Sequence, residues 1–279
     1  MRKLFISADM EGCAAVSAQQ ALLPERWAWE WAAARRWMTA EVVATADAAF
    51  AAGFDEVIVA DSHGNAHNID PDALPQNVLL VRSWPRPLLH MQGVESAGVE
   101  CCAFVGAHAG PSSRDSILSH TFSGQAFRGV KLNGEPCSEG YLNAALAGEF
   151  GRPVVFVSGD VQTVEDARRY APEAATFVTK HSIGWRSQMS LPPAQVCGLL
   201  KAAAAGAFAR RPPQPFIVRG PLRLELEMTS QGAAEMLAYL PAVERLNGYT
   251  VAASFESVEA VVRFVAFAAL YTPTGMPAL

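Results

Sequence analysis

Five side chains of the kinds that bind metal ions lie in the first half of the chain, each at or near the end of a short apolar run. They are three carboxylates and two imidazoles: Asp9, Glu11, His63, His108 and Glu139. A tetrahedral zinc ion has four ligands, and in catalytic sites the protein supplies only three of them. Five such groups exceed that number and predict a centre for two metal ions, of the kind found in hydrolases.

The placement of three of these residues predicts that they meet. Asp9, His63 and His108 each follow a predicted strand by only a few residues. In open α/β sheets, ligands bind outside the carboxyl ends of the parallel strands. Asp9 and Glu11 are two positions apart, so both side chains point the same way in an extended segment. A single metal ion, or a pair sharing one acid, could bind there, although a lone acid after a strand is more often a helix N-cap or a solvated loop residue.

The pattern of apolar runs predicts the framework that positions these residues. Short β-rich runs alternate with helical patterns, beginning with a strand at 3–7, a helix at 27–52 and a strand at 56–60. This alternation is typical of βαβ units. Further strands are predicted at 78–82, 102–107, 117–122, 127–132, 153–158 and 175–180, and further helices at 138–150, 161–170 and 192–209. We therefore expect an α/β fold in which a mostly parallel β-sheet carries helices on both faces, an αβα sandwich.

A proline-rich segment, 210–215, is the one break in composition along the chain. Behind it lie strand-like runs at 216–218, 222–228 and 250–255, together with two helical patterns. Such a break is typical of a boundary between structural units. We expect a catalytic α/β domain at 1–211 that holds the metal site, and a smaller α+β subdomain packed on it at 212–279.

Charge and composition exclude several classes of partner. The net charge is −5, and no run of lysine or arginine is present. Nucleic acids and anionic membranes attract basic surfaces, so neither is an expected partner. Acidic residues interrupt the amino-terminal apolar stretch before it reaches the length of a signal peptide, and no uninterrupted apolar run is long enough to span a membrane. Five cysteines without Cys-x-x-Cys spacing indicate reduced thiols, so we expect a soluble cytoplasmic protein.

Two other catalytic readings find little support in the sequence. Ser112 and Ser119 lie near histidines, but no Gly-x-Ser-x-Gly motif surrounds a serine. The glycines at 106 and 110 resemble part of a phosphate-binding loop, yet the motif is incomplete and His108 occupies its middle. His67 is expected on a loop surface, and His90 and His181 have no supporting pattern.

An ordered series of short motifs resembles the D-aminopeptidases of the bacterial dipeptide-operon type, peptidase family M55. The resemblance extends over nearly the whole chain. The motifs are Ser7-Ala-Asp9-Met-Glu11-Gly12, Met38-Thr-Ala-Glu41, Asp61-Ser-His63, Gly106-Ala-His108-Ala, Ser119-His120, the segment 133–139, Gly140-Tyr-Leu-Asn143 and Ser158-Gly159-Asp160.

The resemblance implies an aminopeptidase with two zinc ions per subunit, for which cobalt or manganese could substitute. It would hydrolyse short peptides with an amino-terminal D-residue, such as D-Ala-D-Ala, through a hydroxide activated by both metals. Asp9 would bridge the ions, Glu11 and His63 would complete one site, and His108 and Glu139 the other. The resemblance also implies a large ring-like homo-oligomer, a decamer of two pentamers, with its active sites facing an internal channel.

Other residues follow from the resemblance less directly. His120 matches the catalytic histidine of the family and would act as a general acid or base or stabilise the oxyanion. Asp61 is either a hydrogen-bond partner of the His63 imidazole or a cap at the end of the strand. Lys131 and Asn133 are weaker candidates for substrate contacts.

Departures from the family pattern leave substrate choice open. Cys13-Ala14-Ala15 replaces a stretch with glycine or serine, and the segment 84–95 is individual to this chain. Fold and metal centre transfer between relatives more readily than specificity does. Two alternatives therefore remain: another binuclear metal amidase or carboxypeptidase acting on cell-wall-type peptides, and a non-catalytic peptide-binding protein.

Overall fold

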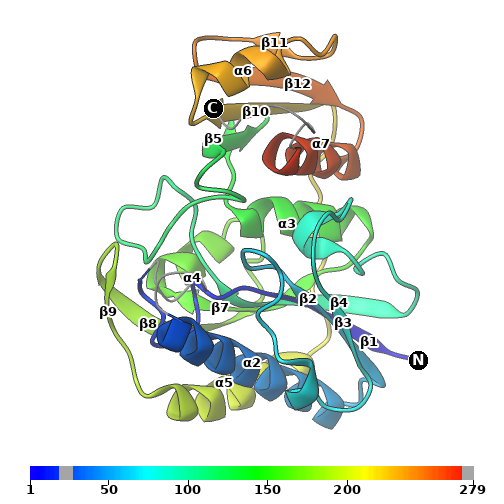
Figure 1. The fold of residues 1–279 in the computed structure, drawn as a ribbon. Helices are drawn as coiled ribbons and strands as arrows, with labels where there is room; N and C mark the ends of the chain where they lie inside the picture. Colours follow the sequence, from blue (N-terminus) through cyan, green and yellow to red (C-terminus); the bar gives the residue numbers. More distant parts are fainter. Residues whose placement is uncertain (19–27, 272–279) are drawn as a thin grey trace.

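A seven-stranded, mostly parallel sheet forms one layer of the protein in the computed structural model, which describes residues 1–18 and 28–271 (Figure 1). The strands, in spatial order, are β3 (Val78–Val81), β2 (Glu56–Asp61), β1 (Lys3–Ala8), β4 (Val99–Ala107), β7 (Val154–Asp160), β8 (Ala175–Gly184) and β9 (Ser187–Met189). Every neighbouring pair from β3 to β8 is parallel, and β9 pairs antiparallel with β8. The predicted α/β class is confirmed.

Helices cover both faces of this sheet. α2 (Ala28–Ala51) and α5 (Pro193–Phe208) pack side by side on one face, and α3 (Glu139–Glu149) and α4 (Val161–Ala167) lie on the other (Figure 1). The central strand β1 is buried on both faces: Leu4 and Ile6 belong to the core beneath α2, and Phe5 belongs to the opposite core. Such double burial is typical of strands in parallel sheets. The predicted first helical residue, Trp27, lies outside the described residues.

A second, antiparallel sheet forms the other layer. Its order is β11 (Glu244–Arg245), β12 (Thr250–Phe255), β10 (Leu222–Met228), β5 (Phe127–Leu132) and β6 (Glu135–Pro136). Two helices accompany it, α6 (Gln231–Leu237) and α7 (Val258–Leu270). Strands β5 and β6 precede residue 212, so this sheet draws on both sides of the predicted boundary. The division into 1–211 and 212–279 stays a prediction.

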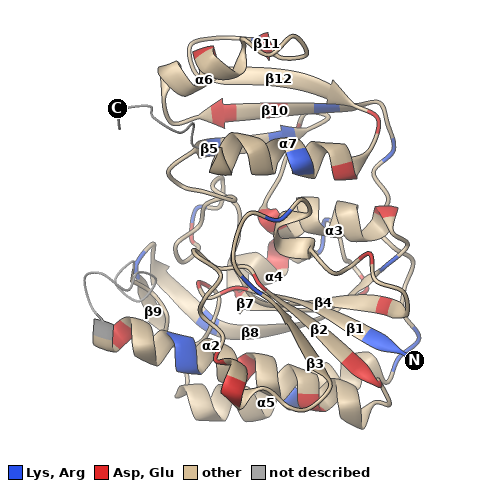
Figure 2. Ribbon diagram, turned by 45° about the vertical axis from the view of Figure 1, so that its right-hand side comes forward, with Lys and Arg blue, Asp and Glu red and all other residues tan. Residues whose placement is uncertain are grey.

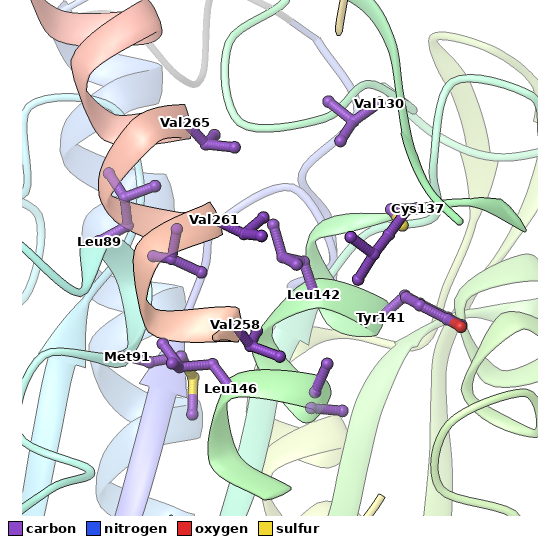
Figure 3. Close-up of a cluster of buried hydrophobic side chains, with 14 of the residues drawn as sticks. Leu89, Met91, Val130, Cys137, Tyr141, Leu142, Leu146, Val258, Val261 and Val265 are labelled. Atoms are coloured by element: carbon purple, nitrogen blue, oxygen red, sulfur yellow. The ribbon is translucent and has the colours of Figure 1, made fainter. Parts of the chain in front are cut away.

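Helix α7 joins the two layers. Figure 3 shows Val258, Val261 and Val265 of α7 facing Leu142 and Leu146 of α3, with the short helix η2 (Leu89–Met91) alongside. All of these side chains belong to one buried cluster. The same cluster includes the buried residues of β10, Leu222, Leu224, Leu226 and Met228. Figure 2 shows that the acidic and basic residues are spread over the helices and strands of both layers. Among the described residues, no helix combines the length and apolarity needed to cross a lipid bilayer.

Two predicted strands are wrong. The segment 117–122 forms no strand, because Leu118 and Phe122 both have positive φ, and Asp160 accepts hydrogen bonds from the Ser116 hydroxyl and the Ile117 amide. Its place beside β5 is taken by β10. The run 216–218 is irregular, and Phe216 packs edge-on against Tyr141 of α3. In both segments, tertiary contacts override the local β propensity.

Candidate metal centre

The carboxyl ends of three adjacent parallel strands carry the predicted metal residues. Asp9 follows β1, His63 follows β2 and His108 follows β4, and these strands are neighbours in the sheet. Glu139 reaches the same place as the first residue of α3, a helix that Ser138 caps by accepting a hydrogen bond from the Tyr141 amide. The structure thus brings all five predicted residues together from four elements.

Asp9, Glu11 and His63 form the first group. The His63 Nδ1 atom lies 2.9 Å from Glu11 Oε2 and 3.3 Å from Asp9 Oδ1. One ligand atom from each of the three residues lies within 4.8 Å of the others. This spacing and donor set fit a single metal ion coordinated by imidazole nitrogen and carboxylate oxygen.

His108, Glu139 and His120 form a second group with the same spacing. The His108 Nε2 atom is 3.1 Å from Glu139 Oε1 and 3.5 Å from Asp9 Oδ2. Asp9 therefore directs one carboxylate oxygen toward each group. Such a carboxylate can be shared by two ions, as in hydrolases with binuclear centres.

The charged groups of this cluster are buried, so their pKa values depend strongly on one another. Asp9, Glu11 and Glu139 are all less than 10% exposed, as are His63 and His108. Burial alone would raise the pKa of Glu139, but the neighbouring imidazoles of His108 and His90 outweigh it and lower that pKa to about 2. Burial likewise opposes a charge on His63, yet Glu11 and Asp9 raise the pKa of His63 well above its usual value. The carboxylates thus favour cations in the spaces between them, as a metal site requires.

His120 faces both groups from the loop that follows β4. Its Nε2 atom is 3.9 Å from Glu139 Oε1 and 4.0 Å from Glu11 Oε1, and its ring stacks on His108 with centroids 4.1 Å apart. The His120 Nδ1 atom lies 2.8 Å from the Leu118 carbonyl oxygen, which can only accept, so Nδ1 carries the proton. The Nε2 atom is then free to exchange a proton with a ligand. At 28% side-chain exposure, His120 is the most accessible histidine of the two groups.

Two glycines allow the loop after β1 to pack against the end of β4. A Cβ atom on Gly12 would lie 1.9 Å from the Ala107 carbonyl oxygen, and one on Gly106 would lie 2.2 Å from the Asp9 carbonyl oxygen. Gly106 also has φ +66°, a conformation that favours glycine. The Gly12 amide donates to the Gly106 carbonyl at 2.8 Å. Larger residues would push the loop after β1 away from β4 and move Asp9 and Glu11 away from His108.

Comparisons with known proteins identify the same family as the sequence motifs do. The family model of peptidase M55, described as D-aminopeptidase, matches residues 1–267. The chain belongs to this family. The D-aminopeptidase of Bacillus subtilis (strain 168) is 28% identical over 249 residues, covering 89% of each chain. The solved structure of the Zn-dependent D-aminopeptidase DppA from Bacillus subtilis, a self-compartmentalizing protease, superposes with a TM-score of 0.87 at 26% identity, over 97% of this chain and 100% of that one.

Family membership confirms the predicted enzyme class, a metallopeptidase of the D-aminopeptidase type. The remaining candidate residues, Asp61, Lys131 and Asn133, lie outside the two groups. Asp61 is fully buried and accepts hydrogen bonds from the Asn68 and Ile69 amides and from the Asn68 side chain. Asn68 in turn donates to the His63 carbonyl at 2.7 Å. Asp61 thus binds the backbone that follows its strand and, through Asn68, contacts the loop that carries His63. Its role at the site stays a prediction.

Lys131 and Asn133 lie in the antiparallel sheet. Lys131 is an exposed residue of β5 and lines a separate cavity of about 550 Å³. Asn133 has φ +53° in the turn between β5 and β6, and its side-chain oxygen accepts from the Arg223 amide at 2.8 Å. The Asn133-Gly134 pair is a strong hairpin signal in the sequence. It gives Asn133 a structural role in the turn.

Two residues of this D-aminopeptidase site were missed by sequence reasoning. The buried Lys180 ammonium donates to the carbonyl oxygens of Glu11, Cys13 and Val16, and so fixes the loop that carries Glu11. His90, on η2, is 5% exposed and its Nδ1 atom lies 3.3 Å from Glu139 Oε2. Both residues are far in sequence from the side chains they support, and neither belongs to a local motif that could have indicated its role.

Proposed function

We propose that this chain is a zinc-dependent D-aminopeptidase with two zinc ions per subunit, acting on short peptides with an amino-terminal D-residue such as D-Ala-D-Ala. The observation that carries the proposal is the position of the Asp9 carboxylate. Its Oδ1 atom lies 3.3 Å from His63 Nδ1, and its Oδ2 atom lies 3.5 Å from His108 Nε2. The zinc dependence of DppA supports the choice of metal.

The donor set assigns ligands to each ion in this proposal. Asp9, Glu11 and His63 would hold one ion, and Asp9, His108 and Glu139 would hold the other. Carboxylate and imidazole ligands suit zinc, and cobalt or manganese could replace it. When bound, the two ions would polarise the scissile carbonyl group and make a water molecule more acidic.

His120 would supply the proton transfer in this proposal. Its Nδ1–H group is directed to the Leu118 carbonyl, which orients the ring and leaves Nε2 toward the space between Glu11 and Glu139. From there Nε2 can accept a proton from the attacking water and deliver it to the leaving amine. While it carries that proton, the imidazolium can also donate a hydrogen bond to the developing oxyanion. The stacking on His108 restricts rotation of the ring.

Two further parts of the proposal concern the setting of the enzyme. We propose a large ring-like homo-oligomer, a decamer of two pentamers. The description of DppA as a self-compartmentalizing protease supports an oligomeric assembly. We also propose a cytoplasmic location. All five cysteines are unpaired and four are buried, as expected of a protein kept in a reducing compartment.

Release of free alanine tests the proposed activity. Zinc-loaded protein is incubated with D-Ala-D-Ala, L-Ala-L-Ala and N-acetyl-D-Ala-D-Ala, with the Asp9→Ala variant as the control. We expect the native protein to cleave only the dipeptide with a free amino-terminal D-residue. The Asp9→Ala variant should lose both this cleavage and the binding of zinc. Cleavage of the acetylated peptide would indicate an amidase or carboxypeptidase instead, because an aminopeptidase requires a free amino terminus. Failure to cleave any peptide with an amino-terminal D-residue would contradict the proposal.

A further inference from the structure

A cavity of about 490 Å³ is lined by two of the five candidate metal residues. These are Glu11 and His63, and His120 lines it beside them. Its walls are mostly apolar and come from distant parts of the chain: Trp84, Leu89, Leu118, Phe122, Trp185 and Leu270. A cavity that combines apolar walls with a few polar groups is typical of a small-molecule site. Here it adjoins the proposed catalytic groups.

One wall is a row of aromatic rings that the surrounding structure holds in place. His90 stacks on Phe122 with ring centroids 5.3 Å apart, and its other neighbour is the Trp84 ring at 5.7 Å. The Trp84 indole donates to the Gly64 carbonyl at 2.6 Å, and the Arg86 guanidinium lies 3.7 Å from the Trp84 ring centroid. Because these contacts fix the rings in advance, a ligand that packs on them loses little of its binding energy to ordering the protein.

Trp185 and Leu270 contribute apolar surface from the β8–β9 hairpin and from the end of α7. Trp185 is 48% exposed and Leu270 is 40% exposed. The Leu118 amide donates to the Trp185 carbonyl at 3.0 Å, which ties the hairpin to the loop that carries His120. Among the described lining residues there is no lysine or arginine. A substrate side chain in this cavity would meet mainly apolar surface, together with the Ser123 and Gln125 side chains.

The two methyl side chains of D-Ala-D-Ala would leave most of this apolar wall uncovered. An aromatic ring or a large aliphatic side chain would cover it and could pack on Trp84 or Phe122, the two rings that contact His90. We propose that the preferred substrates are short peptides with a free amino-terminal D-residue in which at least one side chain next to the scissile bond is aromatic or large and aliphatic. This inference rests on the proposed aminopeptidase function and specifies its substrate class.

Catalytic efficiencies for D-Phe-D-Ala, D-Ala-D-Phe and D-Ala-D-Ala test this substrate class. The better of the two phenylalanine peptides should exceed D-Ala-D-Ala in kcat/KM by ~10-fold to ~100-fold, because even one added methylene in an apolar pocket is worth roughly 10-fold to 200-fold. If D-Ala-D-Ala is cleaved as well as either, the substrate class is overturned and the aminopeptidase function stands. If no peptide with a free amino-terminal D-residue is cleaved, the function itself fails.

A pair of tryptophan variants tests the wall directly. Trp185→Ala should reduce the ratio of kcat/KM for the phenylalanine peptide to that for D-Ala-D-Ala by about 10-fold, mainly through KM. Trp29→Ala, which removes a tryptophan that is 66% exposed on α2, should leave the ratio unchanged. Leu270→Ala provides a second test of the wall if circular dichroism shows that Trp185→Ala disturbs the fold. An unchanged ratio in a folded wall variant would overturn the proposal.

Discussion

In the seven-stranded sheet, polar side chains gather beyond the carboxyl ends of three adjacent strands, whereas in the five-stranded sheet they alternate along the strands. Strand β1 is buried at five of its six residues, and Asp9 follows directly after its end. Strand β10 instead alternates Leu222, Leu224 and Leu226 with charged residues, so that one face packs on the core and the other faces water. Parallel strands all end on the same side, and this common edge is what assembles a site from residues far apart in sequence.

The antiparallel layer contributes to the site by covering it. Its helix α7 packs on α3, the helix that begins with Glu139, and the end of α7 reaches the cavity that Glu11 and His63 line. The alternating strands of this layer bury their apolar face against the same core as α3. Substitutions at the edge of the parallel sheet should therefore change chemistry, and substitutions in the strands and turns of the antiparallel sheet should change stability.

Among the substitutions that test this difference between the two layers, His120→Asn should have the largest effect, on catalysis. His120→Asn keeps a donor that can reach the Leu118 carbonyl but removes the group that transfers protons, so kcat should fall by ~10²-fold to ~10⁴-fold. Zinc content, measured by elemental analysis, should stay at the native value. His67→Asn serves as the matched control, because His67 is an exposed loop residue that contacts Ser83 and Arg82. Loss of zinc from His120→Asn would show that His120 is a metal ligand.

An intermediate effect is expected at Glu41, which lies beneath the site on α2. Burial raises the pKa of the Glu41 carboxyl to about 7, and its Oε1 atom accepts from the Ala14 amide at 2.8 Å. The folded state therefore holds this proton more tightly than the unfolded state does. The resulting stabilisation is fully present below the unfolded pKa of about 4.5 and is lost as the pH rises through 7.

Glu41→Gln keeps an oxygen for the Ala14 amide and cannot titrate. Between pH 5 and pH 8 the unfolding free energy of the native protein should fall by about 2 kcal/mol more than that of the variant, as measured by urea denaturation in the presence of a chelator. The chelator removes the contribution of metal binding to the pH dependence. Parallel curves for the two proteins would mean that Glu41 is ionised in the folded state throughout this range.

The smallest effect is expected at Asn133, in the antiparallel layer. Asn133→Ala loses the hydrogen bond from the Arg223 amide and places alanine at φ +53°, so the unfolding free energy should drop by about 1 to 2 kcal/mol. Asn133→Gly should recover part of this loss, because glycine adopts positive φ without strain. The kcat/KM value should not change in either variant. A rise in KM would break the comparison by placing a substrate contact in the antiparallel sheet.

The meeting of the candidate metal residues could be predicted because it depends on short patterns along the chain. Asp9, His63 and His108 each follow an apolar run whose strand character is evident from the sequence, and parallel strands end at one edge. The segment 117–122 could not be predicted in the same way. Its apolar residues suggest a strand, but the buried Asp160 carboxylate binds its backbone and turns it into the loop that presents His120.

The sequence by itself determined the parallel core, the five candidate metal residues and the family, because strand periodicity and short motifs depend on neighbours along the chain. Only the tertiary structure decided which residues support that centre. Lys180 holds the Glu11 loop, and His90 lies against Glu139, across long separations in sequence. The same holds for the cavity wall, where Trp84, Trp185 and Leu270 meet from three separate elements. Contacts of this kind depend on how the layers pack, and no local pattern encodes them.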